Sequence, residues 1–320
     1  MRYAVIADVH GNLLALDTVL KDAAARQVDQ YLFVGDYCIS HPQPNDCLNR
    51  IRAMENSVVI RGNDDQHLER LIGQDAATWT DGQMQATYWC HGDITPENRA
   101  WLFGLPHTAA ITHAGVTIRM AHKCTHFFEG LQDDIWSSIY VANHYAHTPL
   151  TPARLREDVQ TKLDNDPDFQ ARFAALPDGV YLFAHTHVQW CYASKDRRKW
   201  LVNCGSCGVP LDGIPGSAPY ALLDISPEGY ISVELQRVPL DIELPIQLLS
   251  NSDLVRHAPV WRCLIEEEMR TGLEKVSFFI HFADAYAQKT GDPRRPFAVD
   301  TWEAAYQAWK ATLPETITPT

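Results

Sequence analysis

The sequence predicts a layered α/β fold that is followed by a helical extension, and three observations support this. Short apolar runs alternate with helical spacing as far as residue 72, and pairs of short strands follow between residues 109 and 237. Apolar residues at helical spacing return beyond residue 246. With 46% apolar and 21% charged residues, the composition is that of an ordinary globular protein.

The first part of the chain alternates between predicted strands and helices. Apolar runs at residues 3–7, 31–34 and 58–60 suit buried strands. A helix is expected over about residues 12–26, where four apolar residues lie at near-helical spacing, and further helices near 45–54 and 65–72. This alternation implies right-handed crossovers and a sheet that is covered on both faces.

From residue 109 onward the pattern changes to hairpins. Strands are predicted at residues 109–112, 116–120, 180–184, 190–193, 200–202, 219–225 and 230–237. Residues 127–179 form an insertion with helical patterning at 152–163 and 169–176. Its aromatic side chains could form a lid over a functional site or pack on the side of the domain; they are Phe127, Phe128, Trp136, Tyr140 and Tyr145.

The last part of the chain, residues 246–320, is predicted to be a C-terminal helical extension of two to four helices. Aromatic and aliphatic residues recur there at helical spacing, for example at Trp302, Ala305, Tyr306 and Trp309. This extension could cap the rim of a site, pack on the core or join two copies into a homo-oligomer. We therefore expect one domain over residues 1–245 and an extension over residues 246–320.

Seven potential metal ligands occur in five short clusters, and each cluster follows a predicted strand. They are Asp8, His10, Asp36, Asn63, His122, His185 and His187. Open α/β folds place their sites at the carboxyl ends of sheet strands, so we expect these side chains to converge. Any one of these short motifs alone is weak evidence, because strand ends often carry polar residues. All five in order, each at a strand end, predict a metal centre.

The residue types indicate which ions would bind. Carboxylate, imidazole and amide ligands suit Mn²⁺, Fe, Zn²⁺, Co²⁺ or Ni²⁺, and the set holds no thiolate, which argues against a structural zinc site. The sequence predicts two divalent ions per chain, with manganese favoured and Asp36 as the bridging carboxylate. Two ions about 3.5–4 Å apart would clamp a phosphoryl group and acidify the water between them, which supplies a hydroxide for in-line attack.

The order of these motifs resembles that of the calcineurin-like metallophosphoesterases, and most closely the small prokaryotic branch of phosphodiesterases and phosphatases. The resemblance rests on Asp8-Val9-His10, Gly35-Asp36, Gly62-Asn63, the lone His122 and His185-Thr186-His187, together with the loop Asn203-Cys204-Gly205-Ser206. It extends from Met1 to about Leu244. It implies a four-layer α-β-β-α metallophosphoesterase sandwich, to which the C-terminal helical extension is added.

The resemblance also implies a division of the ligands and an activity. One metal would take Asp8, His10, Asp36 and His187, and the other Asp36, Asn63, His122 and His185. The expected activity is metal-dependent hydrolysis of small phosphoesters or nucleotides by the bridging hydroxide. Two alternatives stay open: a non-catalytic sensor or scaffold that binds a phosphate ligand, and a serine/threonine-type protein phosphatase, which Arg61-Gly62-Asn63 suggests.

The chain departs from the family pattern at two positions close to the ligands. Asp64 stands where many members have a His that acts as general acid or contacts the substrate. Asp64 could be an acid if its pKa were raised, or Asp64 or Asp65 could cap the following helix. His67 and His126 are other candidate acids.

Two basic residues near the predicted ligands are candidate substrate contacts. Arg61 could clamp an anion with its planar fork or form a surface salt bridge. Lys123 replaces the usual Gly after the lone His122, where it could add positive charge to the site or point to solvent. The predicted catalytic set is therefore Asp36, Asn63, Asp64 and Arg61, and the predicted substrate-binding set is Arg61, Asn63 and Lys123.

Charge and cysteine usage limit the partners and the compartment. A formal net charge of −13 argues against broad binding of nucleic acid and favours a small phosphorylated substrate that is drawn to the metals. No apolar run approaches the roughly 20 residues of a membrane span. The first strand begins at Arg2 without an apolar leader, and the eight cysteines show no pairing framework, so we expect a cytoplasmic protein.

Overall fold

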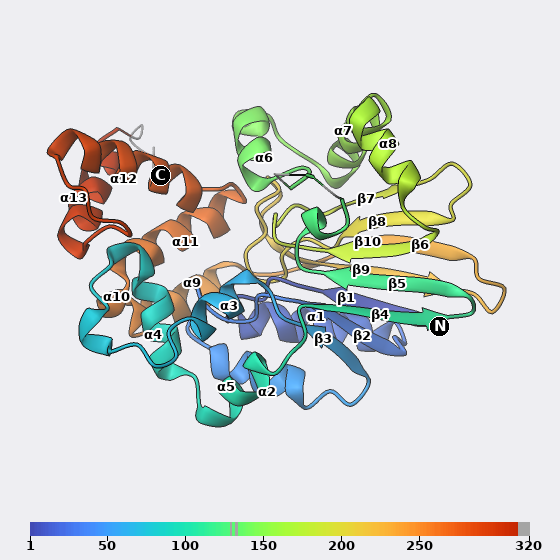
Figure 1. The fold of residues 1–320 in the computed structure, drawn as a ribbon, viewed down its shortest axis with the longest axis horizontal. Coiled ribbons are helices and arrows are strands. Elements are labelled where there is room, and N and C mark those ends of the chain that lie inside the picture. The colour runs from blue at the N-terminus through green and yellow to red at the C-terminus, as the bar shows by residue number, and fades with distance from the viewer. Residues whose placement is uncertain (129, 132–133, 313–320) are drawn as a thin grey trace.

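The computed structural model describes residues 1–128, 130–131 and 134–312. Within them, two five-stranded sheets pack face to face, with the orders β10-β9-β1-β2-β3 and β4-β5-β6-β8-β7 (Figure 1). The strands are β1 (Arg2–Ile6), β2 (Gln30–Val34), β3 (Ser57–Ile60), β4 (Thr108–His113), β5 (Val116–Ala121), β6 (Gly179–Phe183), β7 (Trp190–Ala193), β8 (Lys199–Asn203), β9 (Ser217–Ile225) and β10 (Ile231–Pro239).

The two sheets share one arrangement, in which a parallel centre carries antiparallel neighbours. β1, β2 and β3 are parallel, and β9 and β10 add an antiparallel hairpin beside β1. In the second sheet β5, β6 and β8 are parallel, and β4 and β7 form antiparallel edges. The parallel strands of each sheet therefore end at a common edge, and the predicted ligands follow at that edge.

Helices occupy both outer faces of this sandwich and one of its ends. The helices are α1 (Leu13–Ala25), α2 (Pro44–Arg52), α3 (Asn63–Glu69), α4 (Gln85–Asp93), α5 (Pro96–Phe103), α6 (Ser138–Tyr145), α7 (Pro152–Asp164), α8 (Pro167–Ala175), α9 (Glu243–Ser250), α10 (Leu254–His257), α11 (Pro259–Thr271), α12 (Val276–Thr290) and α13 (Val299–Lys310). Figure 1 shows α11, α12 and α13 against one end of the sandwich.

The alternation of buried side chains along the strands explains the layers. Val5 of β1 points into the core between the two sheets, whereas Ile6 points outward and packs in one cluster with Leu16 of α1. On the outer face of the second sheet, Tyr192 packs with Phe173 of α8. Strands buried on both faces read as continuous apolar runs, as these do. The predicted α-β-β-α sandwich is confirmed.

The insertion at residues 127–179 contributes mainly to the outer helical layer. Helices α7 and α8 pack through their apolar faces on β6, β7 and β8. The aromatic side chains for which a lid was considered all belong to or pack against this cluster; they are Phe127, Phe128, Trp136, Tyr140 and Tyr145. These aromatic side chains therefore pack on the side of the domain, which was the second of the two alternatives. Residues 129, 132 and 133 of this segment lie outside the described residues.

The C-terminal extension shares its core with the domain. Its outer helices have a cluster of their own, in which Phe279 packs with Trp302 and Tyr306. Leu249 and Ile265, in contrast, belong to the cluster that covers the outer face of the first sheet. Among the described residues, no helix is both long and apolar enough to span a membrane. The predicted extension ends at residue 320, and residues 313–320 lie outside the described part of the chain.

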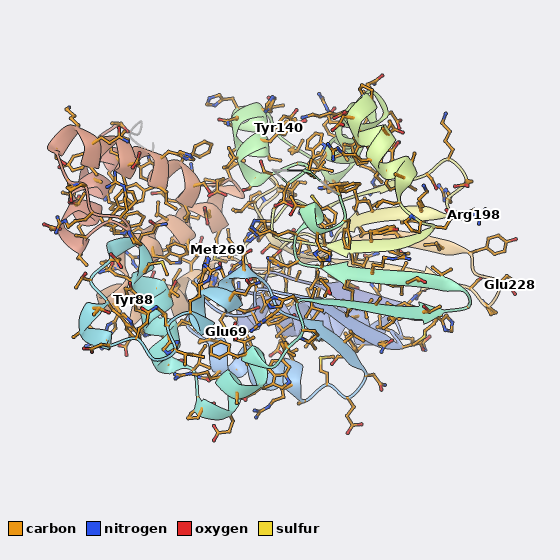
Figure 2. All side chains as sticks on the ribbon, viewed as in Figure 1. Glu69, Tyr88, Tyr140, Arg198, Glu228 and Met269 are labelled. Atoms are coloured by element: carbon orange, nitrogen blue, oxygen red, sulfur yellow. The ribbon has the colours of Figure 1, made fainter. Side chains whose placement is uncertain are left out.

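Figure 2 gives the orientation of the molecule through single side chains. Met269 lies at the end of the sandwich that faces the C-terminal helices, and Arg198 and Glu228 lie at the opposite end. Arg198 belongs to the basic turn between β7 and β8 and pairs with Asp178. This basic turn is therefore far from the edge at which the predicted ligands converge.

Candidate metal centre

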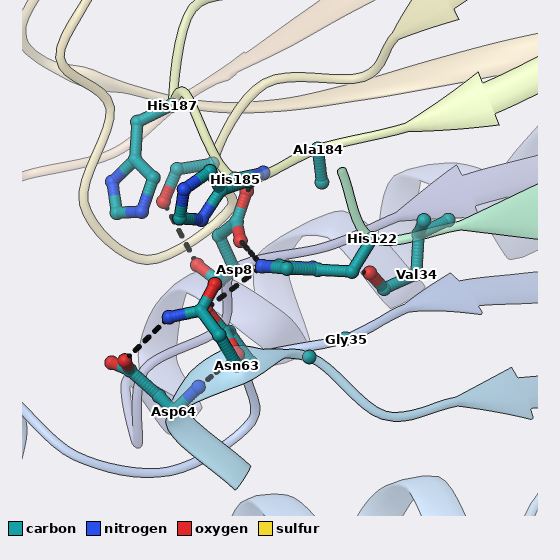
Figure 3. Close-up of polar contacts among 12 residues, drawn as sticks. Asp8, Val34, Gly35, Asn63, Asp64, His122, Ala184, His185 and His187 are labelled. Carbon is teal, nitrogen blue, oxygen red and sulfur yellow. Dashed lines mark hydrogen bonds and ion pairs between the residues drawn. The ribbon is translucent and has the colours of Figure 1, made fainter. Parts of the chain in front are cut away.

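The loops that follow five parallel strands bring the predicted ligands together. Asp8 follows β1, Asp36 follows β2, Asn63 follows β3, His122 follows β5 and His185 follows β6. Figure 3 shows the side chains of Asp8, Asn63, His122 and His185 converging from both sheets. The carboxylate and imidazole atoms form three groups, Asp8–His10–His187, Asp36–His122–His185 and His10–Asp36–Asp64, and within each group they lie within 4.8 Å of one another.

The first group is built around two facing imidazoles. His10 Nε2 lies 3.1 Å from His187 Nε2. His187 Nδ1 lies 2.7 Å from the carbonyl oxygen of Val209, so it carries the proton and donates to that oxygen. The lone pair of His187 Nε2 then points into the site, as in metal-bound histidines whose second nitrogen donates to a carbonyl. Burial and then the neighbouring His187 lower the pKa of His10 to about 3, so His10 is neutral.

The second group pairs an imidazole with the central carboxylate. His122 Nε2 lies 3.0 Å from Asp36 Oδ2, and His122 Nδ1 donates to the carbonyl of Val34 over 2.7 Å. Burial lowers the pKa of His122, but the carboxylates of Asp36 and Asp8 outweigh it and raise the pKa to about 10. Without a metal, the proton on Nε2 therefore occupies the place that a cation would take, since metal binding displaces such protons.

Several buried polar atoms in the site have no hydrogen-bond partner within the described residues. They are Asp8 Oδ1, His10 Nδ1 and Asn63 Oδ1. Buried polar atoms are nearly always paired, so such atoms call for a ligand. Oxygen and imidazole donors suit Mn, Fe, Co or Zn. The residues present therefore fit a divalent metal centre.

The backbone holds the ligands in an uncommon conformation. Asp8, His10, Asp36, His185 and His187 all have positive φ, between 49° and 69°. This left-handed region costs a non-glycine residue about 1–3 kcal/mol and recurs at functional sites. Sequence reasoning missed this feature, because Asp and His carry no local signal for positive φ comparable to that of glycine.

Two glycines allow the loops after β2 and β3 to approach each other. A Cβ atom at Gly35, where φ is 102°, would lie 2.6 Å from His122 Nδ1. A Cβ at Gly62 would collide with the carboxylate of Asp36. The glycines of Gly35-Asp36 and Gly62-Asn63 are thus required by the close contact between these ligand loops.

Asp65 fastens the same two loops together. Its carboxylate accepts the backbone N–H groups of Asp36 (3.0 Å), Gly62 (2.9 Å) and Tyr37 (3.2 Å). The bond from Gly62 caps the N-terminus of α3, as one alternative for Asp64 or Asp65 predicted. Asp65 thereby positions the backbone of Asp36, although its side chain does not face the metal groups.

Asp64 points into the site. Its backbone N–H donates to Asp36 Oδ1 over 2.9 Å, and its carboxylate accepts from Asn63 Nδ2 (Figure 3). The other carboxylate oxygen lies 3.7 Å from His10 Nδ1. Burial and the Asp36 and Asp65 carboxylates raise the pKa of Asp64 well above its usual range. Bound dications would oppose this shift, because they favour the ionised carboxylate.

Arg61 does not line the cavity that holds the two ligand groups. Its guanidinium donates to Glu69 Oε2 (2.8 Å) and to the carbonyl of Phe103 (3.1 Å), and lies 2.8 Å from His107 Nε2. Arg61 is therefore oriented toward a salt bridge with Glu69, as one of the two alternatives predicted. Its role as an anion clamp stays a prediction. Lys123 directly follows the ligand His122, and burial, His122 and the charge of Lys123 together lower the pKa of His185 well below its usual value.

The ligand cavity, of about 200 Å³, has one wall whose residues the sequence did not identify, although capping the rim of a site was one of three alternatives for the extension. The C-terminal extension supplies this wall through Trp261, Ile265, Glu268, Glu274, Val276 and Ser277. The extension therefore borders the site as well as packing on the core. The apolar spacing of α11 signalled a packed helix, but nothing in it specified the surface that the helix would meet.

Two buried carboxyl groups in this wall are held by specific hydrogen bonds. Glu268 Oε1 accepts the N–H groups of Lys275 and Val276 over 2.8 and 2.9 Å. Ser138 of α6 donates to Glu274 over 2.6 Å, which links the insertion to the extension. Burial and then the neighbouring Glu274 raise the pKa of Glu268 well above its usual range. This wall therefore offers no positive charge to an anionic ligand.

Comparison with known proteins agrees with this geometry. Residues 1–228 match the calcineurin-like phosphoesterase superfamily domain. An uncharacterised protein from Methanocaldococcus jannaschii is 27% identical over 252 residues, which cover 75% of this chain and 88% of that protein.

Two solved structures share the fold at low sequence identity. A metallophosphoesterase from Sphaerobacter thermophilus gives a TM-score of 0.58 at 20% identity and covers 85% of this chain and 100% of its own. A hypothetical protein from Pyrococcus horikoshii gives 0.56 at 16% identity, with 86% and 99% covered. The family implies divalent metal ions, which the Asp and His groups described above could bind. The chain belongs to the calcineurin-like phosphoesterase superfamily, and is a hydrolase that acts on phosphoric ester bonds.

Proposed function

We propose that this protein hydrolyses small phosphoesters or nucleotides at a centre of two divalent metal ions. The observation that carries the proposal is the position of Asp36. This carboxylate belongs to one group with His122 and His185 and to another with His10 and Asp64. It is therefore the natural bridge between two ions. When bound, such a pair supplies an activated water and neutralises charge on the phosphoryl group.

The residues around the site would orient the metal ligands and exclude water. The carbonyls of Val34 and Val209 fix the ring orientation of His122 and His187. Asp64, which is half-buried and donates its backbone N–H to Asp36, would hold a proton or accept a hydrogen bond from the substrate. Trp261 and Ile265 of the extension line the cavity on one side.

The size of the cavity supports a small substrate. Its volume of about 200 Å³ is below the roughly 300–1,000 Å³ of typical pockets for drug-sized ligands. The protein phosphatase alternative depends on Arg61, whose guanidinium is engaged by Glu69. The manganese preference, the cytoplasmic location and a homo-oligomer through the C-terminal helices stay predictions.

Turnover of a chromogenic phosphodiester tests the proposal. We expect activity with Mn²⁺ in the wild type and its loss in Asp36→Asn, while Asp46→Asn, a matched change on the exposed face of α2, retains it. A panel of Mn²⁺, Fe²⁺, Co²⁺, Ni²⁺ and Zn²⁺ identifies the active ion. No turnover with any of these ions would favour the sensor or scaffold, and a preference for phosphopeptides would favour the protein phosphatase.

A further inference from the structure

A second cavity of about 490 Å³ borders the metal groups. It shares a wall with the metal centre, because Asn63 and His122 line it. Asn63 also lines the first cavity, so the two spaces meet at this ligand. A substrate phosphate at the centre could therefore extend into either space.

The two cavities differ in charge. The first has the buried carboxyl groups of Glu268 and Glu274 in its wall. The second is lined by Lys123, Arg70 and Arg61, and none of its described lining residues is Asp or Glu. This contrast stands out in a chain whose formal net charge is −13. Because clefts with one sign of charge concentrate ions of the opposite sign, the second cavity attracts anions.

Two of these cations are not engaged by the protein. The third cation, Arg61, has its charge neutralised by an ion pair with Glu69. For the side chains of Lys123 and Arg70, the structure shows no hydrogen bond or ion pair with any part of the chain that it describes. Lys123 is half-buried and follows the ligand His122, whereas Arg70 is exposed at the end of α3. Both side chains are therefore free to meet an anion that extends from the metal centre.

We propose that this cavity binds a second phosphate group of the substrate, through Lys123 and Arg70. The inference rests on the proposed phosphoesterase function and makes it more specific. The preferred substrate would carry a second phosphate close to the scissile one, as phosphoanhydrides and bisphosphorylated compounds do. The uncharged remainder of the substrate would then lie in the first cavity, beside Trp261 and Ile265.

Binding of phosphonates that cannot be hydrolysed tests this proposal. Calorimetry on the full chain with excess Mn²⁺ compares methylphosphonate with two bisphosphonates, which carry a methylene and a propylene linker. We expect at least one bisphosphonate to bind about tenfold more tightly than methylphosphonate, because it adds charge-assisted hydrogen bonds. In the double variant Lys123→Gln/Arg70→Gln this advantage should fall to within about twofold, and high salt should reduce it in the wild type.

The matched control removes the same charges elsewhere. Lys195→Gln/Arg52→Gln changes two exposed residues that do not line the cavity and should keep the full advantage. Equal binding of mono- and bisphosphonates by the wild type, or an unchanged advantage in Lys123→Gln/Arg70→Gln, would overturn the proposal. The two proposals fail separately: a cavity-dependent advantage without turnover of any phosphoester contradicts only the hydrolase, and turnover without this advantage contradicts only the second site.

Discussion

Asp65 should control both the stability and the metal affinity of the protein, although it binds no metal in our assignment. Its fully buried carboxylate accepts three backbone N–H groups, from Asp36, Tyr37 and Gly62. Asp65→Ala leaves three buried donors without a partner, at about 1–3 kcal/mol each before relaxation. Because the loops can partly adjust and such terms do not add fully, we expect a loss of about 3–5 kcal/mol in the free energy of unfolding.

The same change should weaken metal binding, because the backbone of Asp36 loses its anchor. Residues that orient a ligand typically change metal affinity by about 10–100-fold. Denaturant unfolding of the metal-free protein and a Mn²⁺ titration measure the two effects, with Asp46→Ala as the control on exposed α2. Asp65→Asn keeps one acceptor oxygen and should lie between wild type and Asp65→Ala. A stability loss below about 1 kcal/mol together with unchanged Mn²⁺ affinity would refute this reasoning.

Three further predictions follow from buried groups. Since the carboxylates of Asp36 and Asp8 overcome burial and raise the pKa of His122 to about 10, Mn²⁺ must displace a proton. The apparent association constant for Mn²⁺ should therefore rise by up to about tenfold per pH unit between about pH 6 and 8. An association constant that calorimetry finds to be independent of pH would contradict this. Burial and Glu274 raise the pKa of Glu268, so the folded state binds this proton more tightly and stability falls as pH rises above the unfolded value of about 4.5. Glu268→Gln should therefore match wild type in thermal melts at about pH 4 and exceed it by at least about 1 kcal/mol at about pH 8, whereas equal stabilities at both would refute the assignment. Truncation after residue 244 removes residues such as Ile265 from the apolar cluster on the outer face of the first sheet. Circular dichroism should therefore show an unfolded or aggregated chain. A folded, active product would show that the extension is dispensable.

The convergence of the ligands could be predicted because each is attached to a feature visible in the sequence. Asp8 and Asp36 follow short apolar runs that suit buried strands, and parallel strands end at one edge. Some helices were harder to predict. Helix α5 begins with Thr95 as N-cap and Pro96 in the first turn, which is a clear start signal, but it is not among the helices expected from the sequence.

The orientation of Arg61 could not be predicted from its neighbours in the chain. Its motif, Arg-Gly-Asn, is compatible with a guanidinium that turns toward the metals or away from them. The choice is made by Glu69 at the far end of α3 and by Phe103 and His107, which the fold brings to the same place. A local motif fixes which residue types are present, whereas the partners of a long side chain depend on packing between distant segments.

The same distinction explains why the extension was the least predictable part of the site. The ligands are specified locally, one loop at a time, and each loop reaches the centre because its strand belongs to a sheet. Glu268 and Trp261 reach the cavity only because α11 buries Ile265 against the domain. Periodicity reveals that α11 has an apolar face, but it does not reveal which surface that face will cover. Catalytic chemistry in this chain is thus encoded in short motifs, while the shape and charge of the surrounding pocket arise from tertiary packing.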